Sequence, residues 1–485
     1  MSALRITTLV LAAICFAPAI IPLFAQESAE TYVRDPDPAV AAKLEQWRDL
    51  KFGFFMHWGL YSKLGIIESW SLCPEDWITR EGMGAENYFT YKANYENVIT
   101  QFNPTGFAPE KWAAAAKAAG MKYVVFTTKH HDGFCMFDTK TTDYKITSAR
   151  SPFSTHPRAN VAKEVFSAFR KEGFWIGAYF SKPDWHCPYY WDPYWPPLDR
   201  NVNYDPKKYP DKWKKFQEYT YTQIEELMTG YGSMDILWLD GAWVAPLAQY
   251  SPFFNTIEMR KVDQNIDMPR IAAMARSHQP GLLVVDRWVP SLYENYLTPE
   301  QKVIDKPIPV PWESCVTLAN NWGYVPNDVY KPTWKVVHML ADVVATGGSL
   351  LLDIGPNPQG ELEPVAYERL KEIGAWMHVN GEAIYGTRPV APYKTAKLRY
   401  TRQKSGAVCA IYLADEKETS MPESITLPGV TAAKGAKVTL LGARGELSWK
   451  QVGDGVVVSV PRSQRENPPC KHAWTIRISS IVTGN

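Results

Sequence analysis

Between about residues 51 and 386, short apolar runs alternate along the chain with segments of helical spacing. In one such unit, an alanine-rich segment runs from Pro109 to Gly120, and the apolar run MKYVVFTT follows it from Met121 to Thr128. A glycine readily ends a helix in the left-handed conformation, and an uninterrupted apolar run is typical of a strand buried on both faces. The pattern therefore predicts a helix followed by a parallel strand.

This helix–strand unit recurs along the same region. The spacing predicts further helices over 162–171 and 211–228, and further strands over 174–181, 234–240, 282–285, 310–315 and 349–354. Their number favours an α/β fold with a (β/α)8-like (TIM) barrel over an open doubly wound sheet. No GxGxxG motif follows the first strand, which ends near Met56, and this weakens a dinucleotide-binding alternative.

The pattern changes after Gly386. Short apolar runs at 407–413, 437–441, 455–460 and 473–478 are separated by glycine, proline and charged residues, with no helical period. Such spacing predicts a β-sandwich. We therefore expect two domains, a (β/α)8-like barrel over 32–386 and a C-terminal β-sandwich domain over 387–485.

The first 25 residues resemble neither domain. Arg5 is their single charge, an apolar stretch follows it, and Ala25 precedes a polar run. These features predict a secretory signal peptide over 1–25, and Pro18 and Pro22 argue against an uncleaved anchor. We expect an exported protein, periplasmic or extracellular, with no transmembrane segment in the mature chain, because no later run approaches ~20 apolar residues.

The composition of the chain reduces the number of possible functions. The 485 residues include 52 Lys+Arg against 51 Asp+Glu, so the chain has no field that would attract nucleic acid. The 19 tryptophans are an unusually large number, and their rigid apolar faces suit the CH-rich faces of sugars as well as a protein core. The six cysteines after the leader are scattered without a CxxC pair, which argues against a zinc site or a disulfide framework.

Polar residues gather where the predicted strands end. His57 follows the first strand and His130 and His131 follow the second, while Tyr179 and Asp240 lie at the ends of the third and fourth. In barrels of this type the active site lies at the carboxyl ends of the strands. We therefore expect these side chains to form an active site.

Asp240 is the most informative of these residues. Side chains alternate along a strand, so Asp240 shares a face with Trp238 while Asp235 points to the opposite face. If Asp240 is the nucleophile of a glycosidase, a second carboxyl must lie ~5–5.5 Å away in a retaining enzyme, or ~6.5–9.5 Å away in an inverting one. The residue pattern leaves three candidates open for that second group: Glu294, Glu300 and Glu313.

A histidine pair with an aspartate also raises the possibility of a metal site. The two histidines are adjacent rather than spaced as HxH, and adjacent strand residues point to opposite faces. Neutral imidazole both donates and accepts hydrogen bonds, which suits sugar hydroxyls. We therefore expect no metal ion and no organic cofactor.

An ordered series of motifs resembles the α-L-fucosidases of glycoside hydrolase family 29. The matching segments cover nearly the whole barrel region, and they are KFGFFMHWGLYS (51–62), TTKHHDGF (127–134), AYFSKPDW (178–185), ILWLDG (236–241), VVDRW (284–288), WESC (312–315), NNWGY (320–324), GGSLLLDIGPNPQGEL (347–362) and NGEAIYGTRP (380–389).

The resemblance implies roles for individual residues. It places the nucleophile at Asp240, and the loop Thr298-Pro299-Glu300 matches the TxE-type loop of the family, which makes Glu300 the expected acid/base. Glu294 and Glu313 remain alternatives. The substrate-binding residues that it implies are His57, His130, His131, Tyr179, Arg287, and Glu68 with Trp70, for which Glu75 and Trp77 are a second possible match.

The function implied by the resemblance is that of a retaining exo-α-L-fucosidase. Such a glycoside hydrolase removes terminal α-L-fucose from fucosylated oligosaccharides or polysaccharides by double displacement. Two alternatives stay open: a related glycosidase that acts on another sugar, such as an α-galactoside or a sulfated fucan, and a catalytically inactive sugar-binding protein.

Overall fold

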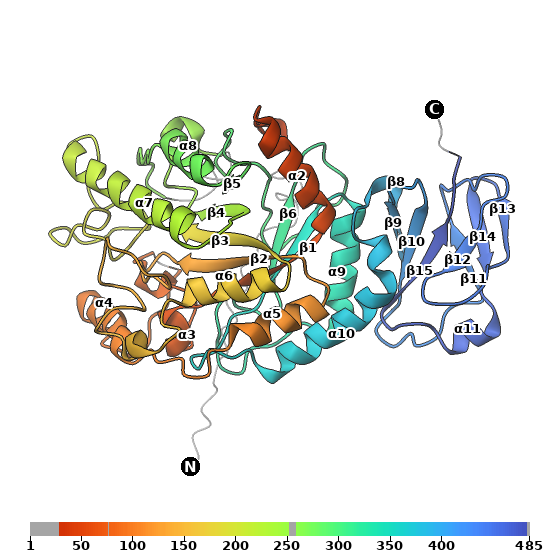
Figure 1. Cartoon of the computed structure of the whole chain (residues 1–485), viewed down its shortest axis with the longest axis horizontal. Helices are drawn as coiled ribbons and strands as arrows, with labels where there is room; N and C mark the ends of the chain where they lie inside the picture. The colour runs from red at the N-terminus through yellow and green to blue at the C-terminus, as the bar shows by residue number, and fades with distance from the viewer. Residues whose placement is uncertain (1–28, 76, 252–258, 483–485) are drawn as a thin grey trace, which may run out of the picture.

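The computed structural model describes residues 29–75, 77–251 and 259–482. The expected signal peptide, 1–25, lies outside the described residues. Two parts lie side by side, a helix-covered parallel sheet and a smaller part built of antiparallel strands (Figure 1). No helix of the described residues has the length and apolar character needed to cross a membrane.

The first part is built on a parallel sheet with strand order β5-β4-β3-β2-β1-β7-β6. Within the described residues it has seven strands: β1 (Phe52–Met56), β2 (Tyr123–Lys129), β3 (Trp175–Ser181), β4 (Ile236–Asp240), β5 (Leu283–Asp286), β6 (Glu313–Thr317) and β7 (Ser349–Asp353). This curled sheet confirms the predicted TIM-like barrel. Its carboxyl ends bring Met56, Lys129, Ser181, Asp240 and Asp353 to one edge, as the motifs require.

The barrel sheet has a gap between β5 and β6, because no ladder of backbone hydrogen bonds joins these two strands in the described residues. The segment 294–300 lies in this gap and is joined to its neighbours by isolated bridges: Glu294 pairs with Val285, Leu297 with Trp312, and Glu300 with Cys315. The predicted strand over 310–315 is therefore shifted, since β6 begins at Glu313. Pro311 lacks the N–H that a strand ladder would use at that point.

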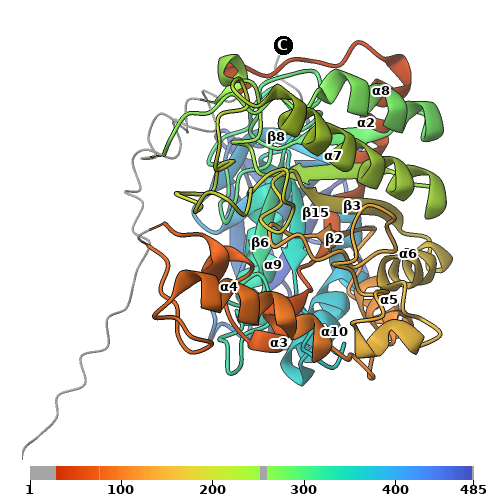
Figure 2. The same ribbon diagram turned by 90° about the vertical axis from the view of Figure 1, so that its left-hand side faces the viewer.

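Helices cover the outer face of the sheet. Figure 2 shows α7 and α8 above the strands, α6 and α5 to the right and α10 below. Proline stands in the first turn of α2, α5, α7, α8 and α10, where no intrahelical N–H partner is needed. The helices are α2 (Pro38–Leu50), α3 (Leu60–Leu64), α4 (Tyr88–Asn97), α5 (Pro109–Ala118), α6 (Val161–Lys171), α7 (Pro210–Gly230), α8 (Met268–His278), α9 (Thr333–Ala345) and α10 (Pro364–Asn380), with single 3-10 turns η1 (Trp70–Leu72), η2 (Val98–Thr100), η3 (Pro152–Thr155), η4 (Leu247–Gln249) and η6 (Gly381–Ala383).

Alternate strand residues fill the barrel interior with large rings. Phe55, Tyr123, Tyr179 and Trp238 belong to one buried cluster that is separate from the apolar layer beneath the helices. Gly53 makes room for it, because a Cβ there would lie 2.4 Å from the Tyr123 ring. The interior is thus packed solid below the edge at which the motifs meet.

The second part begins at β8 and is antiparallel throughout. One sheet has the order β12-β15-β10-β9-β8 and the other β11-β14-β13, and they enclose their own apolar core. α9 and α10 contact this part, and Trp376 Nε1 donates to the carbonyl of Ala473 over 2.9 Å. The predicted C-terminal β-domain is confirmed, with β8 (Arg388–Thr395), β9 (Leu398–Arg402), β10 (Val408–Leu413), β11 (Ser424–Leu427), β12 (Val438–Leu440), β13 (Trp449–Val452), β14 (Gly455–Ser459), β15 (Ala473–Ile478) and the short helix α11 (Arg462–Glu466).

Candidate active site

Asp240 is fixed at the carboxyl end of β4 by its neighbours on both sides. Its carbonyl accepts the N–H of Lys182 over 2.9 Å. Its carboxylate accepts the Tyr179 hydroxyl at Oδ2 over 2.8 Å and Arg287 Nη1 at Oδ1 over 3.1 Å. Burial alone would raise the pKa of Asp240, but Arg287, His131 and these hydrogen bonds hold that pKa well below its usual value. Asp240 is therefore an ionised carboxylate at every physiological pH.

Arg287 connects Asp240 to a second carboxylate. The residue follows β5 directly, and its Nη2 donates to Glu300 Oε2 while Nη1 holds Asp240. Burial opposes the charge of Arg287, but Glu300 and Asp240 together raise its pKa, so it stays cationic. The side chain of Glu300 is 33% exposed, against 16% for Asp240, so Glu300 is the more accessible of the two carboxylates. One buried cation thus holds an enclosed carboxylate and a more accessible one together.

The other two acid/base candidates lie in different surroundings. Glu313 is fully buried inside the barrel, where it accepts the Tyr123 hydroxyl over 2.6 Å and Trp238 Nε1 over 3.1 Å. Glu294 is also buried and accepts the backbone N–H of Trp288 over 2.8 Å. Burial raises the pKa of Glu313 to about 7 and that of Glu294 to about 8. Of the three glutamates, Glu300 is the one that Arg287 bonds together with Asp240.

His57 directly follows β1, and a hydrogen bond to Asp353 orients its ring. Its Nδ1 is hydrogen-bonded to Asp353 Oδ1, at the end of β7, over 2.8 Å. Burial lowers the pKa of His57, so its imidazole is neutral. The sequence analysis does not single out Asp353, although this residue lies one position before the end of the strand predicted over 349–354 and ends β7 in the structure.

His130 and His131 lie together beside Asp240. His130 Nδ1 is hydrogen-bonded to Ser69 Oγ over 2.6 Å, and burial lowers the pKa of His130 to about 4. His131 Nε2 lies 3.7 Å from Asp240 Oδ2, and burial likewise lowers the pKa of His131. With His57 they give three neutral imidazoles, each able to donate one hydrogen bond and accept another. Ser69 is a second partner that the sequence did not reveal.

The structure alters the expectation about the orientation of this histidine pair. β2 ends at Lys129, so both histidines follow the strand and its alternation does not separate them. Their rings lie 4.3 Å apart, and one ligand atom each from His130, His131 and Asp240 lies within 4.8 Å of the others. Arg287 already occupies Asp240 Oδ1 with a full positive charge, which opposes the binding of a cation at the same carboxylate.

Glu68 and Trp70 reach the site, whereas the second possible pair lies at its rim. Glu68 is buried and accepts the N–H of Gly323 over 2.8 Å, and burial raises its pKa to about 7. The Trp70 ring lies 5.3 Å from the His131 ring. Glu75 instead pairs with Arg200, and Trp77 is 50% exposed.

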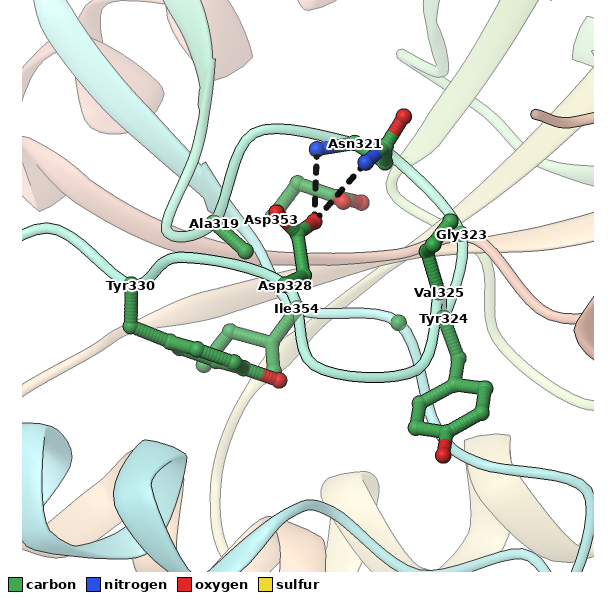
Figure 3. Close-up of a pocket in the computed structure, with 10 residues that line it drawn as sticks. Ala319, Asn321, Gly323, Tyr324, Val325, Asp328, Tyr330, Asp353 and Ile354 are labelled. Atoms are coloured by element: carbon green, nitrogen blue, oxygen red, sulfur yellow. Dashed lines mark hydrogen bonds between the residues drawn. The ribbon is translucent and has the colours of Figure 1, made fainter. Parts of the chain in front are cut away.

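The loop that follows β6 packs against His57, since the Trp322 ring lies 5.2 Å from the His57 ring. With Asp353 and Ile354 it lines a small pocket, in which the Asp328 carboxylate accepts the backbone N–H of Asn321 over 3.0 Å and its side-chain amide over 2.9 Å (Figure 3). The same loop supplies the Gly323 N–H that binds Glu68. Asp328 therefore stabilises the loop that holds Glu68. This pocket lies beside the candidate active site and is not its centre.

These features define a class of enzyme. Two carboxyl groups held close together at the carboxyl edge of a parallel barrel match the pair of Asp/Glu residues that most glycoside hydrolases use.

Comparison with known proteins specifies the family. The family model for alpha-L-fucosidase matches residues 20–382, and that for the alpha-L-fucosidase C-terminal domain matches residues 392–479. The chain is 29% identical to human tissue alpha-L-fucosidase over 90% of each chain. The chain belongs to the alpha-L-fucosidase family of glycoside hydrolases.

Solved structures agree with this assignment. Alpha-L-fucosidase isoenzyme 1 from Paenibacillus thiaminolyticus superposes with a TM-score of 0.71 and 29% identity, covering 92% of this chain and 100% of the other. A GH29 alpha-L-fucosidase from Bacteroides thetaiotaomicron, solved as a trapped covalent intermediate with 2-fluoro-fucosyl fluoride, gives a TM-score of 0.69 and 25% identity over 93% of this chain and 97% of the other.

Proposed function

We propose that the protein is a retaining exo-α-L-fucosidase that removes terminal α-L-fucose from fucosylated oligosaccharides or polysaccharides. The observation that carries this proposal is the bond of one arginine, Arg287, to both Asp240 and Glu300. The covalent intermediate trapped in the Bacteroides relative supports a double displacement.

In the first step, an ionised Asp240 oxygen attacks the anomeric carbon of fucose, and the bond from that carbon to the leaving oxygen breaks. Glu300 gives its proton to this oxygen, so the leaving group departs neutral. The suppressed pKa of Asp240 suits its role, since the carboxylate is available as a nucleophile and stable again when it leaves.

In the second step, water attacks the same carbon of the fucosyl ester. Glu300, now a carboxylate, accepts a proton from the water, and the ester bond to Asp240 breaks. Two inversions at one carbon return the original configuration. Both carboxylates end in their starting protonation states, and no further reactant is consumed.

Recognition falls to the side chains around the two carboxylates. The methyl group of fucose at C5 can favour an aromatic wall, but a methyl-sized difference supplies only ~1–3 kcal/mol. The neutral imidazoles of His57, His130 and His131 supply directional hydrogen bonds, which discriminate between hydroxyl patterns more strongly. Glu68 and Trp70 complete the set.

Asp240→Gly with azide rescue tests the proposal. The variant is expected to lose hydrolysis of an aryl α-L-fucoside, and azide is expected to restore turnover with an inverted fucosyl azide as product. Parent-level activity in the variant would contradict the assignment of Asp240. Faster cleavage of an aryl α-galactoside than of the fucoside would favour the related-glycosidase alternative.

Export is proposed separately, from the sequence of residues 1–25. N-terminal sequencing of protein recovered from the periplasm or the medium is expected to begin at Gln26. A chain that retains Met1 in the cytoplasm would contradict it.

A further inference from the structure

Trp288, next to Arg287, has a backbone conformation that is unfavourable for its type. Its φ is +59°, in the left-handed region that bulky side chains rarely adopt. Backbone strain of this kind persists only where the surroundings enforce it, and it gathers at functional sites. A contact must therefore hold Trp288 in place.

Glu294 supplies this contact. Its Oε1 accepts the backbone N–H of Trp288 over 2.8 Å. Glu294 is 4% exposed and stands at the start of the segment in the gap between β5 and β6, bridged to Val285. The proposed mechanism gives this buried carboxyl no chemical step, and burying it costs free energy unless it is bonded.

The indole of Trp288 contacts both Arg287 and the backbone that precedes Glu300. Its ring centroid lies 4.1 Å from Cζ of Arg287, so the guanidinium stacks on it. Its Nε1 donates to the carbonyl of Thr298 over 3.1 Å, two residues before Glu300. The ring therefore contacts the cation that holds Asp240 and also the backbone that carries Glu300.

We propose that Glu294 is a positioning residue, which fixes Trp288 in its left-handed conformation so that the indole orients Arg287 and the Glu300 backbone relative to Asp240. This inference rests on the proposed function.

The geometry of the arginine explains why such a clamp is needed. A guanidinium presents its N–H groups in a rigid plane, and it can bond one carboxylate with two nitrogens as readily as two carboxylates with one nitrogen each. Stacking on the indole fixes the plane in which Arg287 lies. Without this stacking, Arg287 can bond Asp240 with two nitrogens and release Glu300, which is then displaced from the leaving oxygen.

The test uses two aryl α-L-fucosides that differ in their need for a proton. A 2,4-dinitrophenyl group departs without acid assistance, whereas a 4-methoxyphenyl group depends on it. General acid catalysis contributes ~10²–10⁴-fold. A displaced Glu300 is thus expected to reduce kcat/KM for the methoxyphenyl substrate at least ~10-fold more than for the dinitrophenyl substrate.

Three variants of the full chain are compared on both substrates. Glu294→Leu removes the acceptor and is expected to show the unequal loss, whereas Glu294→Gln keeps a carbonyl acceptor and is expected to stay close to the parent. Trp288→Gly suits the positive φ but removes the ring, and it is expected to show the same unequal loss. It decides the test if Glu294→Leu does not fold.

Glu313→Gln is the matched control, because Glu313 is an equally buried glutamate that does not bond Arg287 or Trp288 in the described structure. Any loss it causes is expected to be equal on the two substrates. If kcat/KM falls by the same factor on both substrates in Glu294→Leu, and likewise in Trp288→Gly, the inference is overturned. If instead the parent enzyme cleaves neither fucoside, the proposed function itself fails, so the two failures are distinguishable.

Discussion

Replacing Arg287 by methionine removes the charge that holds the two carboxylates proposed as catalytic, while the apolar volume of the side chain is largely kept. Asp240 then loses the hydrogen bond from Nη1 and Glu300 loses the one from Nη2. A hydrogen bond to a charged group contributes ~1.5–3 kcal/mol, and ~1.4 kcal/mol is tenfold in rate. If the positioning of the two carboxyl groups by Arg287 stabilises the transition state by the same order of free energy, its loss predicts a ~10- to 100-fold decrease in kcat/KM.

The pH profile of Arg287→Met gives a more specific signature. Burial acts to raise the pKa of Asp240, and Arg287 is the strongest influence that lowers it. In the proposed mechanism Asp240 attacks only as a carboxylate, so activity is expected to fall as the pH drops through its pKa. Without the arginine this pKa rises, and the acidic limb of the kcat/KM profile is expected to move to higher pH.

The control for this experiment is a second arginine–carboxylate pair, Arg399 with Asp342, at the contact between the barrel and the C-terminal domain. Arg399→Met is expected to lower the unfolding temperature without moving the acidic limb. If Arg287→Met keeps the parent profile, or if its activity stays within about twofold of the parent, the role assigned to Arg287 in Asp240 ionisation is wrong.

Two further predictions concern buried groups around the site. Asp353→Leu is expected to raise KM for an aryl fucoside about tenfold, because the His57 ring loses the bond that orients it, and a lost hydrogen bond from this ring to the sugar costs ~1–1.5 kcal/mol of binding. Asp353→Asn keeps a hydrogen-bonding partner and is expected to remain near the parent, and equal KM values in the two variants would contradict the role of Asp353. Glu313 has an ordinary pKa of 4.5, and burial raises it to about 7 in the folded protein, so the folded state binds more protons between these values and the free energy of unfolding is expected to fall as pH rises from 4.5 to 7. Urea denaturation of Glu313→Gln at several pH values is expected to show a smaller decrease of the free energy of unfolding between pH 4.5 and 7. The same decrease as in the parent would mean that Glu313 ionises normally.

The edge of the sheet at which the candidate residues meet could be predicted from the sequence, because this edge depends on where strands end. His57, Asp240 and Arg287 each follow or end a continuous apolar run, and such runs are visible without tertiary information. The helix and strand limits agree with the structure to within a few residues for the same reason, apart from β6. That strand starts after Pro311 rather than before it, because the proline has no N–H to give to a ladder.

Other parts of the site depend on contacts between distant segments. The residue pattern does not separate Glu294, Glu300 and Glu313. Their burial does, and so does the partner that the folded chain brings to each of them: Trp288, Arg287 or Tyr123. The orientation of His130 and His131 depends on β2 ending at Lys129, and periodicity locates strand ends poorly.

The gap between β5 and β6 has a consequence for how this active site can change. Asp240 lies on β4, which is hydrogen-bonded to strands on both sides, so one inserted residue there would turn every following side chain to the opposite face. Glu300 lies on a segment held by isolated bridges rather than by a ladder, so an added residue there disturbs single contacts, such as the Glu300–Cys315 bridge, and leaves the neighbouring strands in register. The proposed nucleophile is thus tied to the register of a whole sheet, whereas the position of the proposed acid/base depends on a few local contacts.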